Sequence, residues 1–254
     1  IMTDLNTTIN EREFLLLHGK LYAFLREAWN IRKVGRLKDI LRGYLDQSIG
    51  SKDDHAFQNL ILEMKTAVLI IDEIGLKQAT VCALLLYHPV LNRCVSIDEV
   101  RKLFGDEVKT IIQGLVKINE FSDKRTAVES ENYIKLLLSI AEDIRVVFVM
   151  LAQQLQLMRD GKGMEQSERV KISVESIYLY APLAHRLGLY KIKSELEDLS
   201  LKYTDRETYD FVARKLNETK RSRDKYINDF IDPVKKKLDQ TDLEYDIKGR
   251  TKSI

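Results

Sequence analysis

The residues best suited to chemistry lie at the end of a strongly apolar segment, where Tyr87 and His88 close a run that begins at Gln78. An imidazole at a helix end can bind a metal ion or carry a proton, and Glu63 supplies a carboxylate from the preceding segment. A divalent cation that activates water needs several anionic or imidazole ligands at one point. Tyr is a poor ligand, so Glu63 and His88 predict at most a weak ion site. The alternative, which we favour, is a surface carboxylate and a hydrogen-bonded imidazole.

Two arginines and a further histidine are the other isolated candidates. Arg145 and Arg159 could hold a phosphate through the guanidinium fork, although ion pairs with Glu142 or Asp160 on the helix surface fit the sequence equally well. His185 stands between apolar neighbours, which is typical of a satisfied core or groove histidine.

Two basic segments invite a phosphate or nucleic-acid interpretation. One is a cluster with interleaved acidic residues, which favours a solvated connecting helix over RNA binding; its basic members are Lys215, Lys220, Arg221, Arg223 and Lys225. The other is the end of the sequence, where Gly249 would let the backbone approach a phosphate beside Arg250 and Lys252. Taken alone, that motif is equally typical of a polar turn.

Helices must position these residues, because apolar side chains recur at helical spacing along most of the chain. The predicted helices of the first half cover residues 11–29, 34–44, 56–74, 78–87, 96–104 and 106–118. Gly75 ends the third of them and Pro89 the fourth. Ser96 with Glu99 forms a capping-box pattern at the start of the fifth.

The second half continues the helical pattern until about residue 204. Residues 131–158 are the strongest hydrophobic stretch, and a second capping-box pattern from Ser139 to Glu142 predicts that one helix ends there and another begins. A further helix places apolar residues on one face, namely Ile192, Leu196, Leu199 and Tyr203. Residues 205–240 read as charged helices. Leu243, Tyr245 and Ile247 then alternate with polar residues, which is the first strand-like signal.

Composition agrees with a helical protein and names no partner. The 254 residues include 44% hydrophobic and 31% charged residues, with only 3 Pro and 11 Gly. A net charge of +2 gives no general attraction to nucleic acid or acidic lipid. Two isolated cysteines, Cys82 and Cys94, favour a reducing cytoplasm, and no apolar run reaches the length that spans a bilayer. We therefore expect a cytoplasmic protein that does not bind membranes.

Several stretches, taken together, resemble the long RelA/SpoT family of guanosine tetra- and pentaphosphate enzymes. Residues 181–190, continuing through 193–199, resemble the hydrolase end of that family. Residues 104–108, 114–117, 141–147 and 249–253 match the same family in the same order. The resemblance covers most of residues 60–254, whereas residues 1–59 match only loosely.

The resemblance implies an all-α fold of the HD-domain type, a metal-dependent phosphohydrolase architecture, followed by the start of an α/β nucleotidyltransferase-like synthetase domain. We expect the hydrolase-like domain to cover residues 1–200. Residues 201–254 would contain connecting helices and the truncated start of the pyrophosphokinase domain.

The same resemblance identifies the positions at which a hydrolase of this family holds manganese. Its first His falls at Glu63, its His-Asp pair at Tyr87 and His88, and its late Asp at Gln153. The acidic pair that activates water falls at Leu91 and Asn92, and a substrate-side Asn falls at Leu157; none of these seven positions keeps the family's residue. We expect no metal and no catalytic residue here, with the Tyr87 ring filling the vacated space.

For the synthetase, the resemblance implies that Gly249, Arg250 and Lys252 contact ATP. In the full-length protein pyrophosphate would pass from ATP to the 3′-hydroxyl of GTP or GDP, with Mg²⁺ as cofactor. The ribosome would be a partner through regions outside this sequence. We expect the 254 residues alone to synthesise nothing and to act as a regulatory partner of the synthetase domain within the same chain.

Two alternatives remain. The first is a guanosine tetraphosphate 3′-pyrophosphohydrolase with a rearranged metal site on Glu63, His88 and Asp143. The second is a sensing module whose former cleft binds a guanine nucleotide without cleaving it.

Overall fold

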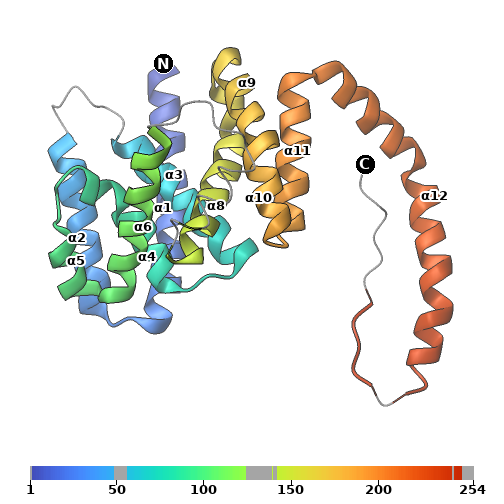
Figure 1. Ribbon diagram of the computed structural model, residues 1–254, viewed down its shortest axis with the longest axis horizontal. Helices are drawn as coiled ribbons and strands as arrows, with labels where there is room; N and C mark the ends of the chain where they lie inside the picture. Colours follow the sequence, from blue (N-terminus) through green and yellow to red (C-terminus); the bar gives the residue numbers. More distant parts are fainter. Residues whose placement is uncertain (1, 49–55, 124–138, 140–141, 242, 248–254) are drawn as a thin grey trace.

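The computed structural model describes residues 2–48, 56–123, 139, 142–241 and 243–247, and throughout these residues the regular structure is helical (Figure 1). The first half contains α1 (Met2–Ala28), α2 (Ile31–Ser48), α3 (Ala56–Leu69), α4 (Gln78–Leu91), α5 (Ile97–Phe104) and α6 (Asp106–Asp123). The second half contains α8 (Ile144–Asp160), α9 (Gln166–Glu175), α10 (Ala181–Arg186), α11 (Tyr190–Thr204) and α12 (Arg206–Leu238). Three short segments complete the helices: η1 (Ile70–Ile74) and η3 (Ser176–Tyr180) are π-helical, and η2 (Gly161–Gly163) is a 3₁₀ turn. The all-α expectation is confirmed.

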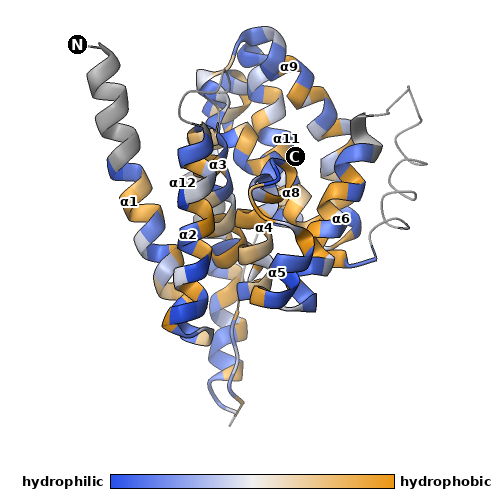
Figure 2. Ribbon diagram, turned by 90° about the vertical axis from the view of Figure 1, so that its left-hand side faces the viewer, coloured by the Kyte–Doolittle hydropathy of each residue, from blue (hydrophilic) through white to orange (hydrophobic). Residues whose placement is uncertain are grey.

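Helix α4 forms the centre of the bundle and packs against α2, α3, α6 and α8. From Val81 to Leu86 its side chains are almost completely buried, as expected for a helix that is apolar on all sides. Figure 2 shows hydrophobic residues concentrated around α4, α6 and α8. The last turn of α4 therefore continues directly from the middle of the core.

The prediction that Pro89 ends this helix is wrong, because α4 continues through Pro89 to Leu91. Proline lacks the N–H that would bond to the carbonyl four residues earlier, which usually breaks a helix. Here Pro89 is buried like Ala79 to Tyr87 before it, so tertiary packing outweighs the lost hydrogen bond. The end of the helix keeps its regular hydrogen bonding, because the N–H of the C-cap residue Asn92 donates to the His88 carbonyl at 2.9 Å. His88 consequently lies inside the last turn of α4.

Two helix boundaries agree with the sequence. Gly75 follows the third predicted helix with φ +80°, a left-handed conformation that glycine adopts without strain, and its N–H donates to the Ile70 carbonyl at 2.8 Å. That helix covers the predicted residues 56–74, although its last turn, η1, is π-helical. At the start of α5 the Ser96 hydroxyl accepts the Glu99 N–H at 3.2 Å, as the capping-box pattern predicts.

Helix α8 begins later than the second capping-box pattern predicts. Its N-cap is Asp143, whose carboxylate accepts the Arg145 N–H at 2.9 Å, so Ser139 and Glu142 do not start it. Asp is a strong N-cap, and this carboxylate also pairs with the Arg145 side chain. Residues 131–138, the other part of that hydrophobic stretch, lie outside the described residues.

The C-terminal part differs from the expectation in two respects. Residues 206–238 form the single helix α12, which packs against α11 and then runs away from the bundle (Figure 1). Residues 243–247 form no strand, although their apolar residues alternate. A strand needs a neighbour to pair with its backbone, and the described residues contain no sheet. The structure therefore does not show the start of the synthetase domain, and a domain boundary at residue 200 stays a prediction.

Among the helices that the structure describes, none is long and apolar enough to cross a membrane.

Candidate functional site

Three of the positions singled out in the sequence meet inside the bundle. Glu63 on α3 lies 3.3 Å (Oε1) from His88 Nε2 on α4. Gln153 on α8 donates through Nε2 to the same carboxylate, at 3.2 Å from Oε1 and 3.5 Å from Oε2. His88 and Gln153, which follow Glu63 by 25 and 90 positions in the chain, thus share one carboxylate. The core helices that position them are held by apolar packing around this polar group.

Glu63 is buried, with 3% of its surface exposed, so the expectation of a surface carboxylate is wrong. Burial raises the pKa of Glu63 above its ordinary value because a charged carboxylate loses its hydration, and hydrogen bonds from His88 and Gln153 offset part of that rise. The His88 side chain retains 26% exposure and closes the outer side of the cluster.

Tyr87, Leu91 and Asn92 lie at the same end of α4 as His88. The Tyr87 side chain is buried, and its ring meets the His88 ring edge-on with centroids 5.2 Å apart. Leu91 is 41% exposed, and the Asn92 amide donates back to the His88 carbonyl at 3.0 Å. Leu157 is half-buried against the core. No carboxylate stands at position 91 or 92 to activate water.

The donors present do not fit a water-activating divalent cation. Glu63 supplies one carboxylate and His88 one imidazole, while the Gln153 amide directs its N–H toward Glu63. Asp143 is ten residues before Gln153 on α8, about 15 Å along the helix axis, and its carboxylate is occupied by the Arg145 side chain and the helix start. Within the described part of the chain, no group of three or more His, Cys, Asp or Glu side chains could hold a metal ion.

Both arginines form ion pairs, but with partners other than those predicted. Arg145 Nη2 lies 2.6 Å from Asp143, and its Nη1 also pairs with Glu107. Arg159 lies between two glutamates: Nε and Nη2 donate to Glu195 at 2.7 and 2.6 Å, and Nη1 and Nη2 donate to Glu73 at 2.7 and 3.1 Å. These hydrogen bonds raise the pKa of both guanidinium groups. Both guanidinium groups are thus occupied within the domain.

Glu142 and Asp160, the predicted partners of these arginines, form ion pairs with lysines instead. Glu142 pairs with Lys117 at 2.8 Å, and Asp160 pairs with Lys65 at 3.3 Å. Lys65 also lies 3.1 Å from Glu13, so this second network joins α1, α3 and the end of α8.

His185 is exposed rather than buried in a core or groove, and its ring meets the Tyr190 ring edge-on at 5.6 Å. Its place in the short helix α10, one turn before the chain reverses at Gly188, turns it outward. The apolar neighbours Leu183 and Ala184 fill the core instead.

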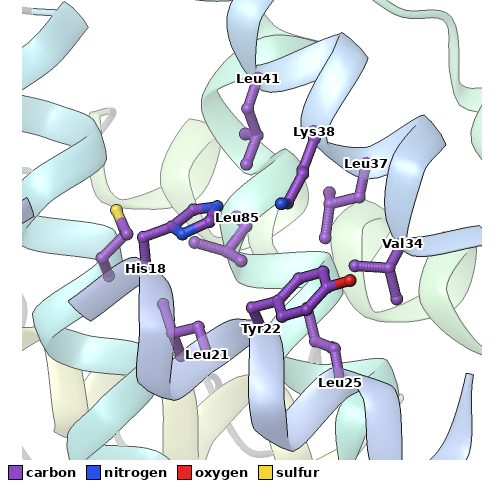
Figure 3. Close-up of a pocket in the computed structure, with 10 residues that line it drawn as sticks. His18, Leu21, Tyr22, Leu25, Val34, Leu37, Lys38, Leu41 and Leu85 are labelled. Carbon is purple, nitrogen blue, oxygen red and sulfur yellow. The ribbon is translucent and has the colours of Figure 1, made fainter. Parts of the chain in front are cut away.

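One feature was missed by sequence reasoning: an apolar hollow of about 40 Å³ between α1, α2, α3 and α4, shown in Figure 3. His18 and Tyr22 stand at its edge with stacked rings 6.1 Å apart, and Lys38 Nζ lies 4.2 Å from the Tyr22 ring centroid. Burial, followed by the charge of Lys38, lowers the pKa of His18. The i, i+4 spacing of these two rings on α1 was the available signal. At about 40 Å³ the hollow has room for water-sized groups but is far smaller than a pocket that encloses an organic ligand.

The structure describes only part of the two basic segments. In the cluster on α12, Lys215 pairs with Glu218 at 2.8 Å, one turn along the helix, which agrees with a solvated helix surface. The side chains of residues 220–224 are not described. Gly249, Arg250 and Lys252 lie outside the described residues, so ATP binding there stays a prediction.

Comparisons with known proteins agree with this architecture. A family model of the HD domain matches residues 43–190. The chain is 34% identical over 189 residues to a GTP pyrophosphokinase of Myxococcus xanthus, covering 73% of this chain and 25% of that protein. It is 33% identical over 193 residues to a guanosine-3′,5′-bis(diphosphate) 3′-pyrophosphohydrolase of Aquifex aeolicus, covering 76% of this chain and 27% of that protein. The chain therefore spans about a quarter of the length of these curated relatives.

Proposed function

The chain belongs to the RelA/SpoT family, and on that premise we propose that it is a catalytically silent hydrolase-like domain that regulates a GTP pyrophosphokinase in the same protein. One relative is named for synthesis and the other for hydrolysis, so family membership alone does not decide between the two activities. The proposal rests on the residues that occupy the hydrolase positions.

The single observation that carries it is the hydrogen-bonded set of Glu63, His88 and Gln153. Hydrolysis of a pyrophosphate ester by this architecture requires a metal ion to generate a hydroxide and an acid or base beside it. Here one carboxylate and one imidazole hydrogen-bond each other, and Leu91 and Asn92 stand where the acidic pair would be. Loss of ligands and of acidic groups together removes both requirements.

Regulation would work by packing. Helices within residues 142–158 and 181–203 would contact the synthetase domain and shift its balance between open and closed states, which requires contacts that differ between those states. Arg159 supports this proposal because it joins α8 to α11, so the two helices can act as one surface. In the full-length protein the β,γ-pyrophosphoryl group of ATP would pass to the 3′-oxygen of GTP or GDP, releasing AMP and a proton, with Mg²⁺ bound by the synthetase.

The first experiment measures pyrophosphate release from guanosine tetraphosphate by the 254-residue chain in buffer containing Mn²⁺, with metal content determined in parallel. We expect neither turnover nor stoichiometric metal. Turnover together with one bound ion per chain would establish a rearranged hydrolase instead.

The second experiment tests the parent activity. A longer form of the protein, extended past residue 254 by a full domain, is supplied with ATP, GTP and Mg²⁺, and AMP and guanosine pentaphosphate are measured. The same form without residues 1–200 is compared with it, and we expect its rate of synthesis to differ. No synthesis by the longer form contradicts the parent assignment, and equal rates contradict the regulatory role.

The rearranged hydrolase is kept as the second candidate because Glu63 and His88 do lie together. Its proposed third ligand, Asp143, is the weak point, since that carboxylate caps α8 and pairs with Arg145. A non-hydrolysing guanine nucleotide sensor is tested by calorimetric titration of guanosine tetraphosphate and GTP into the 254-residue chain; absence of binding removes it.

A further inference from the structure

We propose that Glu63, His88 and Gln153 form a metal-independent clasp, which replaces the ion of hydrolytic relatives as the link between α3, α4 and α8. The inference rests on the proposed function in that it concerns the same position. It goes further because it assigns a structural role to residues that would otherwise be remnants. The shape of the domain would then be set without any divalent cation.

The first argument is the geometry of the three side chains. Each comes from a different helix, and both donors converge on Glu63 Oε1, His88 at 3.3 Å and Gln153 at 3.2 Å. A metal ion links protein segments in the same way, by drawing ligands from several elements to one point. The clasp achieves this with a carboxylate as the common acceptor.

The second argument is the apolar surroundings. Leu60, Met64 and Ala67 on α3 are buried within one turn of Glu63, and α4 is apolar from Val81 to Leu86. Apolar contacts tolerate sliding of one helix along another, whereas a buried carboxylate has strong preferences for the positions of its donors. A shift of α8 by one residue would move Gln153 about 1.5 Å and leave Glu63 with one donor fewer. The clasp therefore fixes the register of the three helices.

The third argument is the arrangement of donors and acceptors. The amide of Gln153 presents N–H to Glu63, because an amide oxygen would repel the carboxylate there. A cation at this point would have to displace both donors from Oε1, yet it would gain only one carboxylate and one imidazole. The replacement of a late Asp by Gln is thus compatible with a hydrogen-bonded link and unfavourable for an ion.

The test combines thermal unfolding with a double-mutant cycle in the 254-residue chain. Unfolding midpoints are first recorded in EDTA, in MnCl₂ and in MgCl₂, and we expect them to agree within about 1 °C because no ion binds the folded state preferentially. His88→Ala is then compared with Glu63→Leu and with the double variant. His88→Ala leaves a buried carboxylate with one donor and should lower the midpoint by about 4–8 °C. The same change in the Glu63→Leu background should cost less than half of that shift.

The matched control is His185→Ala, which removes an exposed imidazole from α10 and should shift the midpoint by less than about 2 °C. If Glu63→Leu fails to fold, a second cycle of His88→Ala and Gln153→Ala replaces it, with the double variant expected to differ from the sum of the single ones. A rise of the midpoint with Mn²⁺ overturns the clasp, and so do equal His88→Ala shifts in both backgrounds. Neither result depends on the assays of hydrolysis or synthesis, so the clasp and the proposed function can fail separately.

Discussion

Two of the links between helix α8 and its neighbours differ in kind. At its middle, the clasp joins Gln153 to a carboxylate that is 3% exposed. Six residues later, about 9 Å along the axis, Arg159 lies between Glu73 and Glu195, a group that we term the fork. The side chains of the fork are 30–37% exposed.

The difference shows which attachment depends on the interior and which on the surface. In the clasp, the cost of removing Glu63 from water is offset by its donors, so losing a donor exposes that cost. In the fork, each charge keeps partial hydration, and its ion pairs are correspondingly weak but require no compensation. The clasp would thus determine how α8 packs on α3 and α4, while the fork connects α8 to η1 and α11.

The largest expected difference between the clasp and the fork comes from replacing a glutamate by lysine in each of them. Glu63→Lys puts an ammonium group into the core beside His88 and should lower the free energy of unfolding by about 3–5 kcal/mol. Glu73→Lys repels Arg159 but leaves Glu195 in place, and should cost about 1 kcal/mol or less. Urea denaturation of the two variants measures both. Similar losses would mean that the clasp is as hydrated as the fork.

The next effect is the pH dependence of the clasp. Burial raises the pKa of Glu63 above its ordinary value of 4.5, so the folded chain binds this proton more tightly than the unfolded chain. Stability then falls as the pH rises from about 4.5 through the raised pKa. Two variants that both lack the imidazole isolate this effect, namely His88→Ala and the double variant Glu63→Leu/His88→Ala. We expect the free energy of unfolding of His88→Ala to fall over this pH range relative to that of the double variant. If urea denaturation gives a constant difference between the two variants from pH 4 to pH 8, the predicted pH dependence is wrong.

A smaller effect is expected from breaking the fork. Arg159→Ala should lower the free energy of unfolding by about 1 kcal/mol, because the charges involved are about one-third exposed and solvent screens them. Arg159→Lys keeps the charge but cannot donate to both glutamates in the same fork geometry, and should recover only part of that loss. Full recovery by Lys would show that charge alone matters at this position. Lys215→Ala on α12, where the ion pair lies within one exposed helix turn, is the control and should have almost no effect.

Sequence reasoning predicted those parts of the fold that depend on local patterns. The helix over residues 56–74, the stop at Gly75 and the cap at Ser96 follow from spacing and from residue types within one or two turns. The errors at Pro89 and at residues 243–247 have the opposite cause. Burial carried α4 through its proline, and the alternating segment had no sheet to join in the described residues.

The candidate site, too, was predicted from the sequence only in part. Resemblance identified Glu63, His88 and Gln153 as related positions, and the structure brings them together. The general rule that carboxylates are exposed then misplaced Glu63, because it does not apply to a carboxylate that accepts hydrogen bonds from side chains on two neighbouring core helices. The partners of Arg159 lie 86 and 36 residues away in the chain, beyond any helical spacing rule.

The smallest expected effect, and the sharpest test of the comparison, is the response to salt. In double-mutant cycles at 0.05 M and 1 M NaCl, the coupling between Arg159 and Glu195 should fall from about 1 kcal/mol to less than half of that, because the screening length shortens to roughly 3 Å at 1 M. The coupling between Glu63 and His88 should not change, since little solvent reaches the carboxylate. Salt also strengthens apolar packing, but this contribution is common to all four corners of each cycle and cancels. Equal losses in both cycles would place the clasp in contact with solvent, and the distinction between an interior link and a surface link along α8 would no longer hold.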